Sequence, residues 1–348
     1  MAQALATKYR PQRFDDVVGQ KYVIDILKKQ VENNSISNCY LFAGPTGTGK
    51  TTLARIFANE LNGGMGTPIE IDAASNNGVD NIRDIIEESQ LTSLDSKYRV
   101  YIIDEAHMIT LAGWNAFLKT LEEPTPTTIF ILCTTEPQKI PSTILNRVMR
   151  FNLTKLSAEE IRLRLEYICS IEGFNRYGEA CDYIAKLSNG GMRDAIMMLD
   201  KCSKYTKDLS VKVVQQLTGS VSYETLIALT NAIVDHNAAE AIQIIEDIYN
   251  AGYDLKVVLE QYLDFILDVE KYILFNNDIN QTKIPHYLEK QGAPLCVEYV
   301  VAFDGSNRYY SALVDSLLEL KFKSKYDTSF KNTLEVFILN LCAGKLIW

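Results

Sequence analysis

The stretch Gly44-Pro45-Thr46-Gly47-Thr48-Gly49-Lys50-Thr51 decides the fold of this 348-residue chain. It fits the pattern G-x-x-x-x-G-K-[ST], in which the backbone N–H groups of a glycine-rich loop surround phosphate oxygens. An apolar run, 39–43, precedes the loop, and an apolar-periodic run, 52–61, follows it. A strand, a loop and a helix in this order are the context typical of nucleotide binding. The sequence therefore predicts a site for a nucleoside triphosphate.

The residues of this loop have separate predicted roles. Lys50 would reach the β- and γ-phosphates of the nucleotide, and the Thr51 hydroxyl would bind Mg²⁺. The other candidate nucleotide-binding residues of the loop and of the helix start are Gly44, Pro45, Thr46, Gly47, Thr48, Gly49 and Thr52.

A second part of the site is predicted where the apolar run 100–103 ends in Asp104 and Glu105. Ligands of open α/β sheets bind at the carboxyl ends of the strands. Asp104 would orient the Mg²⁺ shell, as the acidic residue after a strand does in P-loop NTPases. Glu105 would position and deprotonate the attacking water, which makes the chain a candidate ATPase.

Composition restricts the protein class. With 47% hydrophobic and 23% charged residues, the chain is typical of soluble proteins, and its net charge of −9 argues against extensive coating of nucleic acid. No apolar run approaches the ~20 residues of a membrane span, and the first residues lack the order of a signal peptide. We therefore expect a cytoplasmic protein with no membrane partner. The seven widely spaced cysteines indicate buried hydrophobes rather than disulfides or zinc ligands.

Hydrophobic periodicity divides the chain into an α/β part and a helical part. Candidate strands, which predict a mainly parallel sheet flanked by helices, are 38–43, 69–73, 99–104, 128–134 and 148–153. From Ser157, the first residue of a Ser-Ala-Glu-Glu capping box, only helical patterns follow. These patterns run at 177–188, 192–204, 210–217, 222–235, 237–250, 254–275, 284–290, 295–302, 305–321 and 329–345. We expect a nucleotide-binding domain at 1–155, a small helical domain at 156–220 and a second helical domain at 221–348.

Several motifs, taken in order, resemble one family. They are Lys8-Tyr9-Arg10-Pro11, Phe14, Val17-Val18-Gly19-Gln20, the glycine-rich loop, Glu70–Ser75, Val100–His107, Phe117–Pro124, Thr134–Pro141 and Gly190–Ala195. Together they resemble the γ/τ-type ATPase subunit of the bacterial DNA polymerase III sliding-clamp loader, over roughly residues 5–205. The resemblance implies an α/β P-loop AAA+ domain, then a small helical lid domain and an all-α collar domain that assembles subunits.

The resemblance also implies roles for residues outside the loop. The residues that would line the adenine pocket are Tyr9, Arg10, Pro11 and Val18. Thr134 would be a sensor that contacts the γ-phosphate or the attacking water. Arg193 would be a second sensor, reaching the γ-phosphate from the lid domain.

Arg147 matches the position of the family's arginine finger, which acts on the ATP of a neighbouring subunit. Such a finger stabilises transition-state charge and makes hydrolysis depend on assembly. The flanking residues depart from the family pattern Ser-Arg-Cys, because this chain has Asn146 and Val148.

One segment departs further from the family. The four-cysteine zinc module that the family carries before Glu70–Ser75 is replaced by Asn62–Thr67, and no cysteine occurs between 40 and 132. We therefore expect ATP and Mg²⁺ as cofactors and no zinc. This shortening, with no long tail after the collar, implies a reduced form, encoded by a divergent bacterium or by a phage and then acting in the host cytoplasm.

The resemblance implies a motor subunit that uses ATP to open a ring clamp and place it on primed template DNA during replication. Its implied partners are the sliding clamp, primed-template DNA and other loader subunits, or further copies of itself, in a five-subunit arc. A polymerase is a further candidate partner. Arg83, Lys97 and Arg99 are candidate DNA contacts, although each is individually better explained as a solvated charge.

Two alternatives stay open from the residues. One is a branch-migration or helicase-like AAA+ motor, which the Asp-Glu-Ala-His run at 104–107 could suggest. The other is a non-hydrolysing, stator-type scaffold subunit. The scaffold reading is disfavoured by the intact Lys50, Thr51, Asp104 and Glu105.

Overall fold

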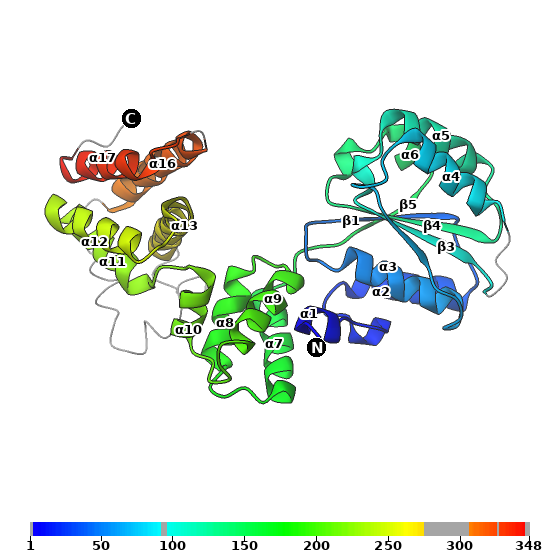
Figure 1. Ribbon diagram of the computed structural model, residues 1–348, viewed down its shortest axis with the longest axis horizontal. Helices are drawn as coiled ribbons and strands as arrows, with labels where there is room; N and C mark the ends of the chain where they lie inside the picture. Colours follow the sequence, from blue (N-terminus) through cyan, green and yellow to red (C-terminus); the bar gives the residue numbers. More distant parts are fainter. Residues whose placement is uncertain (1–2, 92–95, 275–305, 326, 345–348) are drawn as a thin grey trace. The chain divides into compact units, whose positions relative to one another are not determined.

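The computed structural model describes residues 3–91, 96–274, 306–325 and 327–344 (Figure 1). The helical patterns at 284–290 and 295–302 lie outside these residues. The described chain divides into two compact units, Met1–Gly173 with Ile184–Lys204, and Phe174–Tyr183 with Tyr205–Trp348.

The first unit is built on a five-stranded sheet. Its strands are β1 (Cys39–Ala43), β2 (Ile69–Asp72), β3 (Arg99–Asp104), β4 (Thr128–Thr134) and β5 (Met149–Asn152). They run parallel in the order β2-β3-β4-β1-β5. The five strands predicted from the apolar runs are therefore confirmed, with ends that differ by at most one residue.

Helices cover both faces of this sheet. Those of the first unit are α1 (Leu5–Lys8), α2 (Lys21–Glu32), α3 (Lys50–Leu61), α4 (Val79–Ser89), α5 (Leu111–Glu122), α6 (Ser142–Leu145), α7 (Ala158–Glu172) and α9 (Met192–Ser203), with short 3-10 turns η1 (Phe14–Asp16), η2 (Ala106–Met108) and η3 (Pro137–Lys139). Figure 1 shows α2 and α3 on one face and α4, α5 and α6 on the other. This is the three-layer arrangement expected for parallel strands joined by helices.

The apolar residues of the strands explain the two layers. Successive side chains of a strand point to opposite faces. Tyr40 and Phe42 accordingly belong to the cluster under α2 and α3, whereas Cys39 and Leu41 belong to the cluster under α4 and α5. All five residues of β1 are buried, because both faces are covered.

Helix α7 begins as its sequence predicts. Ser157 accepts a hydrogen bond from the Glu160 N–H, and the Glu160 carboxylate accepts one from the Ser157 N–H at 2.8 Å, so the capping box is confirmed. The helix ends at Gly173, whose φ of 69° is a conformation that glycine adopts without strain. Helix α8 (Gly178–Leu187) has residues in both units.

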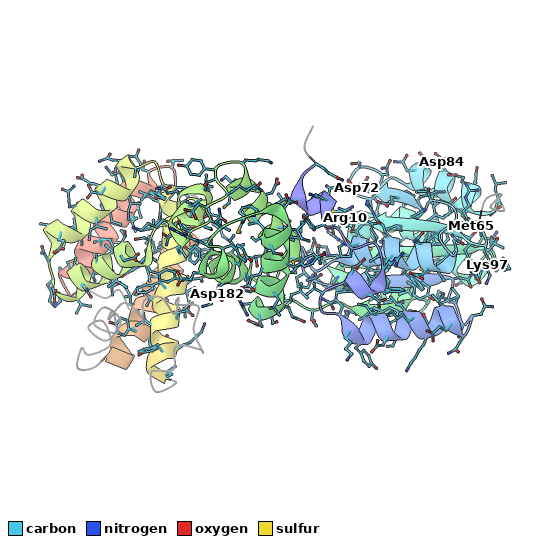
Figure 2. All side chains as sticks on the ribbon, turned by 90° about the horizontal axis from the view of Figure 1, so that it is seen from below. Arg10, Met65, Asp72, Asp84, Lys97 and Asp182 are labelled. Atoms are coloured by element: carbon cyan, nitrogen blue, oxygen red, sulfur yellow. The ribbon has the colours of Figure 1, made fainter. Side chains whose placement is uncertain are left out.

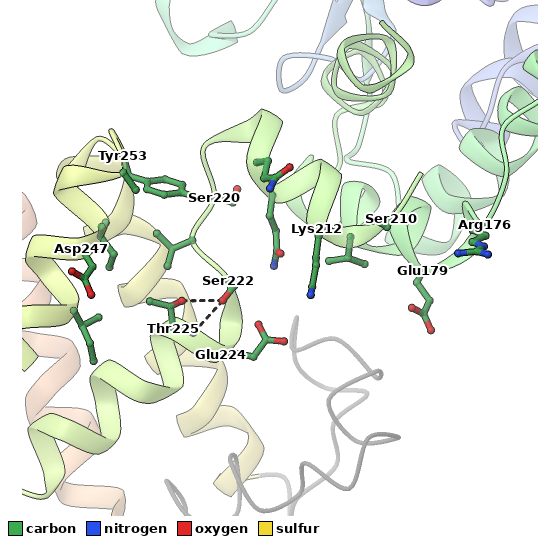
Figure 3. A pocket seen from close by; sticks show the side chains of 17 residues that line it. Arg176, Glu179, Ser210, Lys212, Ser220, Ser222, Glu224, Thr225, Asp247 and Tyr253 are labelled. Atoms are coloured by element: carbon green, nitrogen blue, oxygen red, sulfur yellow. Dashed lines mark hydrogen bonds between the residues drawn. The ribbon is translucent and has the colours of Figure 1, made fainter. Parts of the chain in front are cut away.

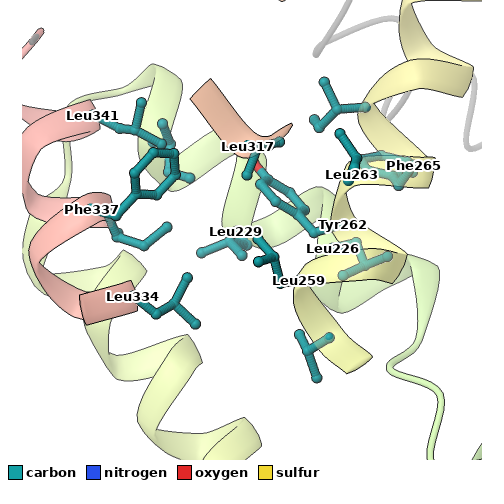
Figure 4. Packing of buried hydrophobic residues seen from close by; sticks show 14 of the residues in the cluster. Leu226, Leu229, Leu259, Tyr262, Leu263, Phe265, Leu317, Leu334, Phe337 and Leu341 are labelled. Atoms are coloured by element: carbon teal, nitrogen blue, oxygen red, sulfur yellow. The ribbon is translucent and has the colours of Figure 1, made fainter. Parts of the chain in front are cut away.

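The second unit is helical in its described part. Its helices are α10 (Val211–Thr218), α11 (Tyr223–Val234), α12 (Ala238–Asn250), α13 (Leu255–Leu274), α16 (Ser306–Ser324) and α17 (Phe330–Cys342). Their apolar faces form one cluster, which includes Leu229 of α11, Tyr262 of α13 and Leu317 of α16 (Figure 4). Helix α17 contacts α11, α12 and α13, so the end of the described chain closes this core.

Two sequence expectations bear on the class of protein. Among the described helices, none is both long and apolar enough to cross a membrane. The six cysteines in the described part are all buried, as predicted for small hydrophobes.

Candidate nucleotide-binding site

The glycine-rich loop joins β1 to α3 and begins at the carboxyl edge of the sheet. Its Gly44 N–H donates to the Thr134 carbonyl at 3.1 Å, which fixes the loop to β4. Gly47 and Gly49 have φ of 76° and 96°, values that require glycine, and Gly49 is the N-cap of α3. The start of α3 therefore faces the space that the loop encloses, with the partial positive charge of a helix N-terminus.

The Lys50 ammonium lies inside this loop. Its Nζ donates to the carbonyl oxygens of Gly44 at 2.9 Å and Pro45 at 3.0 Å, and the residue is only 7% exposed. Burial lowers the pKa of Lys50, while the neighbouring Glu105 and Asp104 oppose this shift. A positive charge is thus held where a phosphate would lie against the loop.

Side chains at the start of α3 and at the end of β3 contact each other. The Thr51 hydroxyl donates to Asp104 Oδ2 at 2.8 Å. Asp104 Oδ1 accepts from the Glu105 N–H at 3.0 Å, and Glu105 has a left-handed backbone, with φ of 46°. Because β3 ends here, the two consecutive carboxylates leave the strand in different directions.

Thr134, at the end of β4, is fully buried beside the loop. Its Oγ1 accepts from the Glu136 N–H at 3.0 Å and lies 3.1 Å from His107 Nδ1. Thr135 donates to Glu105 Oε2 at 3.1 Å. Thr134 and Glu105, predicted from separate motifs, are thus linked through neighbouring side chains.

Sequence reasoning missed three residues of this edge: His107, Thr135 and Glu136. His107 Nε2 lies 3.2 Å from Glu136 Oε2, and the same oxygen accepts from Lys139 Nζ at 2.6 Å. The contact with Lys139 lowers the pKa of Glu136, with a smaller contribution from His107. Their place in the sequence could have indicated them, because all three follow within three residues of the ends of β3 and β4.

Helix α9 begins against the glycine-rich loop. The Met192 N–H donates to the Gly47 carbonyl at 3.1 Å, and a Cβ on Gly47 would lie 3.0 Å from Gly191 Cα. Arg193 therefore leaves the first turn of α9 next to the loop. Burial, followed by the charges of Arg55 and Arg193, lowers the pKa of Arg10, which Figure 2 labels.

The N-terminal motif is attached to α7. The Tyr9 hydroxyl donates to Glu172 Oε1 at 2.6 Å, and Arg164 Nη2 donates to the Tyr9 carbonyl at 3.1 Å. Burial, then the contact with Glu172, raises the pKa of Tyr9 to about 12. Pro11 and Val18 are half-buried in the segments on either side of η1.

Arg147, the predicted arginine finger, is not among the predicted site residues that the structure brings together around the glycine-rich loop. It is exposed, between α6 and β5, where Nη1 donates to the Thr143 carbonyl at 2.7 Å and Nη2 pairs with Glu122 Oε1 at 2.7 Å.

The candidate DNA contacts also have partners within the chain. Arg83 pairs with Asp80, Arg99 with Glu88, and Lys97 donates to Asn34 Oδ1.

The oxygen atoms at the edge of the sheet fit a magnesium ion. Mg²⁺ prefers oxygen ligands and is usually held by one or two protein groups plus substrate phosphates. Thr51 and Asp104 supply a hydroxyl and a carboxylate 2.8 Å apart beside the phosphate loop. In the part of the chain that the structure describes, no group of three His, Cys, Asp or Glu residues forms a candidate cage for a metal.

A pocket of about 960 Å³ lies in the helical unit, and residues of α10, α11 and α12 contribute to its lining (Figure 3). Its charged residues have both signs, with Arg176 and Lys212 positive and Glu179, Glu224 and Asp247 negative. This lining favours no single class of ligand.

Two family models match separate parts of the chain. The model described as DNA polymerase III, delta subunit matches residues 69–157. The model described as DNA polymerase III subunits gamma and tau domain III matches residues 209–346.

Solved structures of Thermotoga maritima RuvB, described as a Holliday junction branch migration motor, share the fold. One has a TM-score of 0.52 and 21% identity, over 65% of this chain and 79% of that chain. At this identity the likeness shows the P-loop AAA+ fold alone.

Curated relatives agree with the family models. The chain is 38% identical over 292 residues to DNA polymerase III subunit tau of Bacillus subtilis, covering 78% of this chain and 52% of the relative. It is 31% identical over 331 residues to DNA polymerase III subunit gamma of Buchnera aphidicola, covering 86% of this chain and 91% of the relative. The chain spans about half the length of the tau relatives it matches. With these motifs on this fold, the chain belongs to the DNA polymerase III gamma/tau family.

Proposed function

We propose that this chain is an ATPase motor subunit of a DNA sliding-clamp loader. It would use ATP binding and hydrolysis to open a ring clamp and place it on primed template DNA during replication. The observation that carries the proposal is the pairing of Thr51 with Asp104 beside the loop, directly before Glu105, in a member of the gamma/tau family.

Each residue of the site has a task in this proposal. The loop residues and Thr52 hold the phosphates, Lys50 neutralises their charge, and Thr51 and Asp104 hold Mg²⁺. Bound Mg²⁺ supplies positive charge that offsets the charge of the phosphates. Glu105 orients the attacking water and accepts its proton, and Thr134 donates a hydrogen bond to the γ-phosphate or to that water.

The residues around the loop would report the nucleotide to the lid domain. Arg193 would contact the γ-phosphate from the start of α9, and the packing of Met192 on Gly47 supports this role. The residues that would line the adenine pocket are Tyr9, Arg10, Pro11 and Val18. We retain the division into domains at 1–155, 156–220 and 221–348 as part of the proposal.

Arg147 would act on the ATP of a neighbouring subunit. A finger that works in trans must be accessible, and Arg147 is exposed. Its ion pair with Glu122 is an exposed one, which costs little to exchange for a phosphate.

The proposed ligands are ATP and Mg²⁺, without zinc, since the family's zinc module is missing from 62–67. The proposed partners are the sliding clamp, primed-template DNA and other loader subunits, or copies of this chain, in a five-subunit arc. A polymerase remains a candidate partner. The AAA+ fold shared with RuvB does not favour a branch-migration motor, because the curated relatives are gamma and tau subunits.

Steady-state ATP hydrolysis tests the proposal. The purified chain is assayed alone, with primed-template DNA, and with the sliding clamp from the same genome. We expect stimulation that requires primed DNA and increases with the clamp. Stimulation by branched or unprimed duplex DNA without a clamp effect would favour a translocating motor. No hydrolysis under any condition, including with the other loader subunits present, would contradict a motor role.

A further inference from the structure

The His107 imidazole is packed between two carboxylates at the carboxyl edge of the sheet. Only 8% of its side chain is exposed. Nε2 lies 3.2 Å from Glu136 Oε2, and Nδ1 lies 3.3 Å from Glu105 Oε2. Because an ionised carboxylate only accepts hydrogen bonds, each ring nitrogen holds its carboxylate by donating a proton toward it.

The opposite nitrogen contacts two residues of the proposed reaction. His107 Nδ1 is 3.1 Å from Thr134 Oγ1 and 3.3 Å from Glu105 Oε2. Thr134 Oγ1 also accepts from the Glu136 N–H at 3.0 Å, and accepting from Nδ1 as well leaves its own proton for the γ-phosphate or the attacking water. A single ring nitrogen thus determines the spacing between the Thr134 hydroxyl and the Glu105 carboxylate.

The imidazole is itself held from the far side. Glu136 is fixed by Lys139, whose Nζ donates to the same Oε2 at 2.6 Å. Glu136 and Lys139 belong to the η3 turn and its N-cap, whereas His107 lies in η2. The ring therefore spans the segments that follow β4 and β3.

We propose that His107 is a positioning residue that links the γ-phosphate sensor Thr134 to the catalytic base Glu105. The inference rests on the proposed ATPase function and adds a residue to it. His107 does not touch the nucleotide. It orients the Glu105 carboxylate relative to the Thr134 hydroxyl, so that the residue that reads the γ-phosphate and the residue that activates water keep one geometry.

A purely structural role for His107 makes a different prediction. If the ring only joined η2 to η3, the important atom would be Nε2, which faces Glu136. Positioning of Thr134 and Glu105 depends instead on Nδ1. Two substitutions separate these atoms, because an asparagine amide occupies roughly the place of Nδ1 and a glutamine amide roughly that of Nε2.

The test compares His107→Asn, His107→Gln and His107→Ala with the wild-type full-length chain. Three quantities are measured: affinity for a fluorescent ATP analogue, melting temperature, and the rate of ATP hydrolysis in a single turnover. We expect the Gln and Ala variants to lose about 10- to 100-fold in rate and the Asn variant to lose about threefold or less, since misplacement of a catalytic group acts on the chemical step. Nucleotide affinity should be unchanged in all three.

Two results would overturn the inference. One is an Ala variant that hydrolyses ATP at the wild-type rate, and the other is a Gln variant that is faster than the Asn variant. The Asn–Gln comparison decides the matter even if His107→Ala does not fold. If the wild-type chain hydrolyses ATP and the variants do so equally well, only the proposed role of His107 is contradicted. If the wild-type chain does not hydrolyse ATP, alone or in its assembly, the proposed ATPase function is contradicted as well.

Discussion

The two units of this chain use polar residues in opposite ways. In the sheet unit, polar side chains from the start of α3 and the ends of β3 and β4 contact each other at one edge, as in the pair Thr51–Asp104. In the described part of the helical unit, the central cluster is made of aliphatic and aromatic residues and Cys342. A buried polar group there, such as Thr230, bonds to the Leu226 carbonyl of its own helix and to the Tyr262 hydroxyl of α13, within the packed core.

This difference indicates that the edge of the sheet serves the reaction, whereas the helical core serves packing. A reaction needs groups of unlike chemistry at one point, and parallel strands bring their carboxyl ends to one edge. A helical core needs only apolar side chains at a helical spacing. Mutations at the edge of the sheet should therefore change hydrolysis with little loss of stability, and mutations in the helical core should do the reverse.

The largest effect is expected from Arg147→Ala. An arginine finger contributes about 10³- to 10⁵-fold to hydrolysis, so the assembled protein should lose a factor in this range. ATP binding by the isolated chain should be unchanged, because the Arg147 side chain bonds to Thr143 and Glu122, neither of which belongs to the proposed nucleotide site. Hydrolysis by the assembly and binding of a fluorescent ATP analogue are compared. Normal assembled activity would show that the finger lies elsewhere.

Glu105→Gln should come next. Removal of a general base costs about 10²- to 10⁴-fold in rate, while the neutral side chain keeps its shape, so ATP should still bind. Single-turnover hydrolysis and nucleotide affinity are measured. The matched control is Asp84→Asn on the exposed side of α4, which should behave as wild type. Unchanged hydrolysis in Glu105→Gln would exclude it as the base.

Leu317→Ala tests the helical unit. Leu317 is fully buried in its core, and truncation of a buried leucine costs about 2–5 kcal/mol. Leu318, the next residue, is 48% exposed, so Leu318→Ala should cost less than about 0.5 kcal/mol. Chemical denaturation followed by circular dichroism gives both values. Loss of ATP-analogue binding in folded Leu317→Ala protein would contradict the expectation that mutations in the helical core leave the nucleotide site unchanged.

The smallest effect is expected from Ser157→Ala. Loss of this N-cap should lower the free energy of unfolding by about 0.5–2 kcal/mol, because the Glu160 N–H loses its acceptor. Ser170→Ala, on the exposed side of the same helix, is the control and should cost less. Equal losses in the two variants would mean that the capping box does not stabilise α7.

Much of the sheet unit could be predicted from sequence because its signals are local. Apolar runs gave the five strands, and the Ser157–Glu160 spacing gave the start of α7. The glycine-rich loop and the strand that ends in Asp104 also predicted that Thr51 and Asp104 share one edge of the sheet, where the structure places their oxygens 2.8 Å apart. By contrast, His107 and Glu136 lie in two separate motifs that assigned them no role, and their contact could not be seen from spacing along the chain.

The sequence by itself determined the family, the order of strands and helices, and the residue types of the phosphate loop. These follow from periodicity and from short motifs, which act over a few neighbouring residues. Only the tertiary structure decided that Thr134, His107 and Glu105 share one set of contacts, and that Lys50 lies inside its loop. The physical reason is that the contacts among Thr134, His107 and Glu105 join the residues at and just beyond the ends of β3 and β4. Strand pairing fixes which strand ends meet.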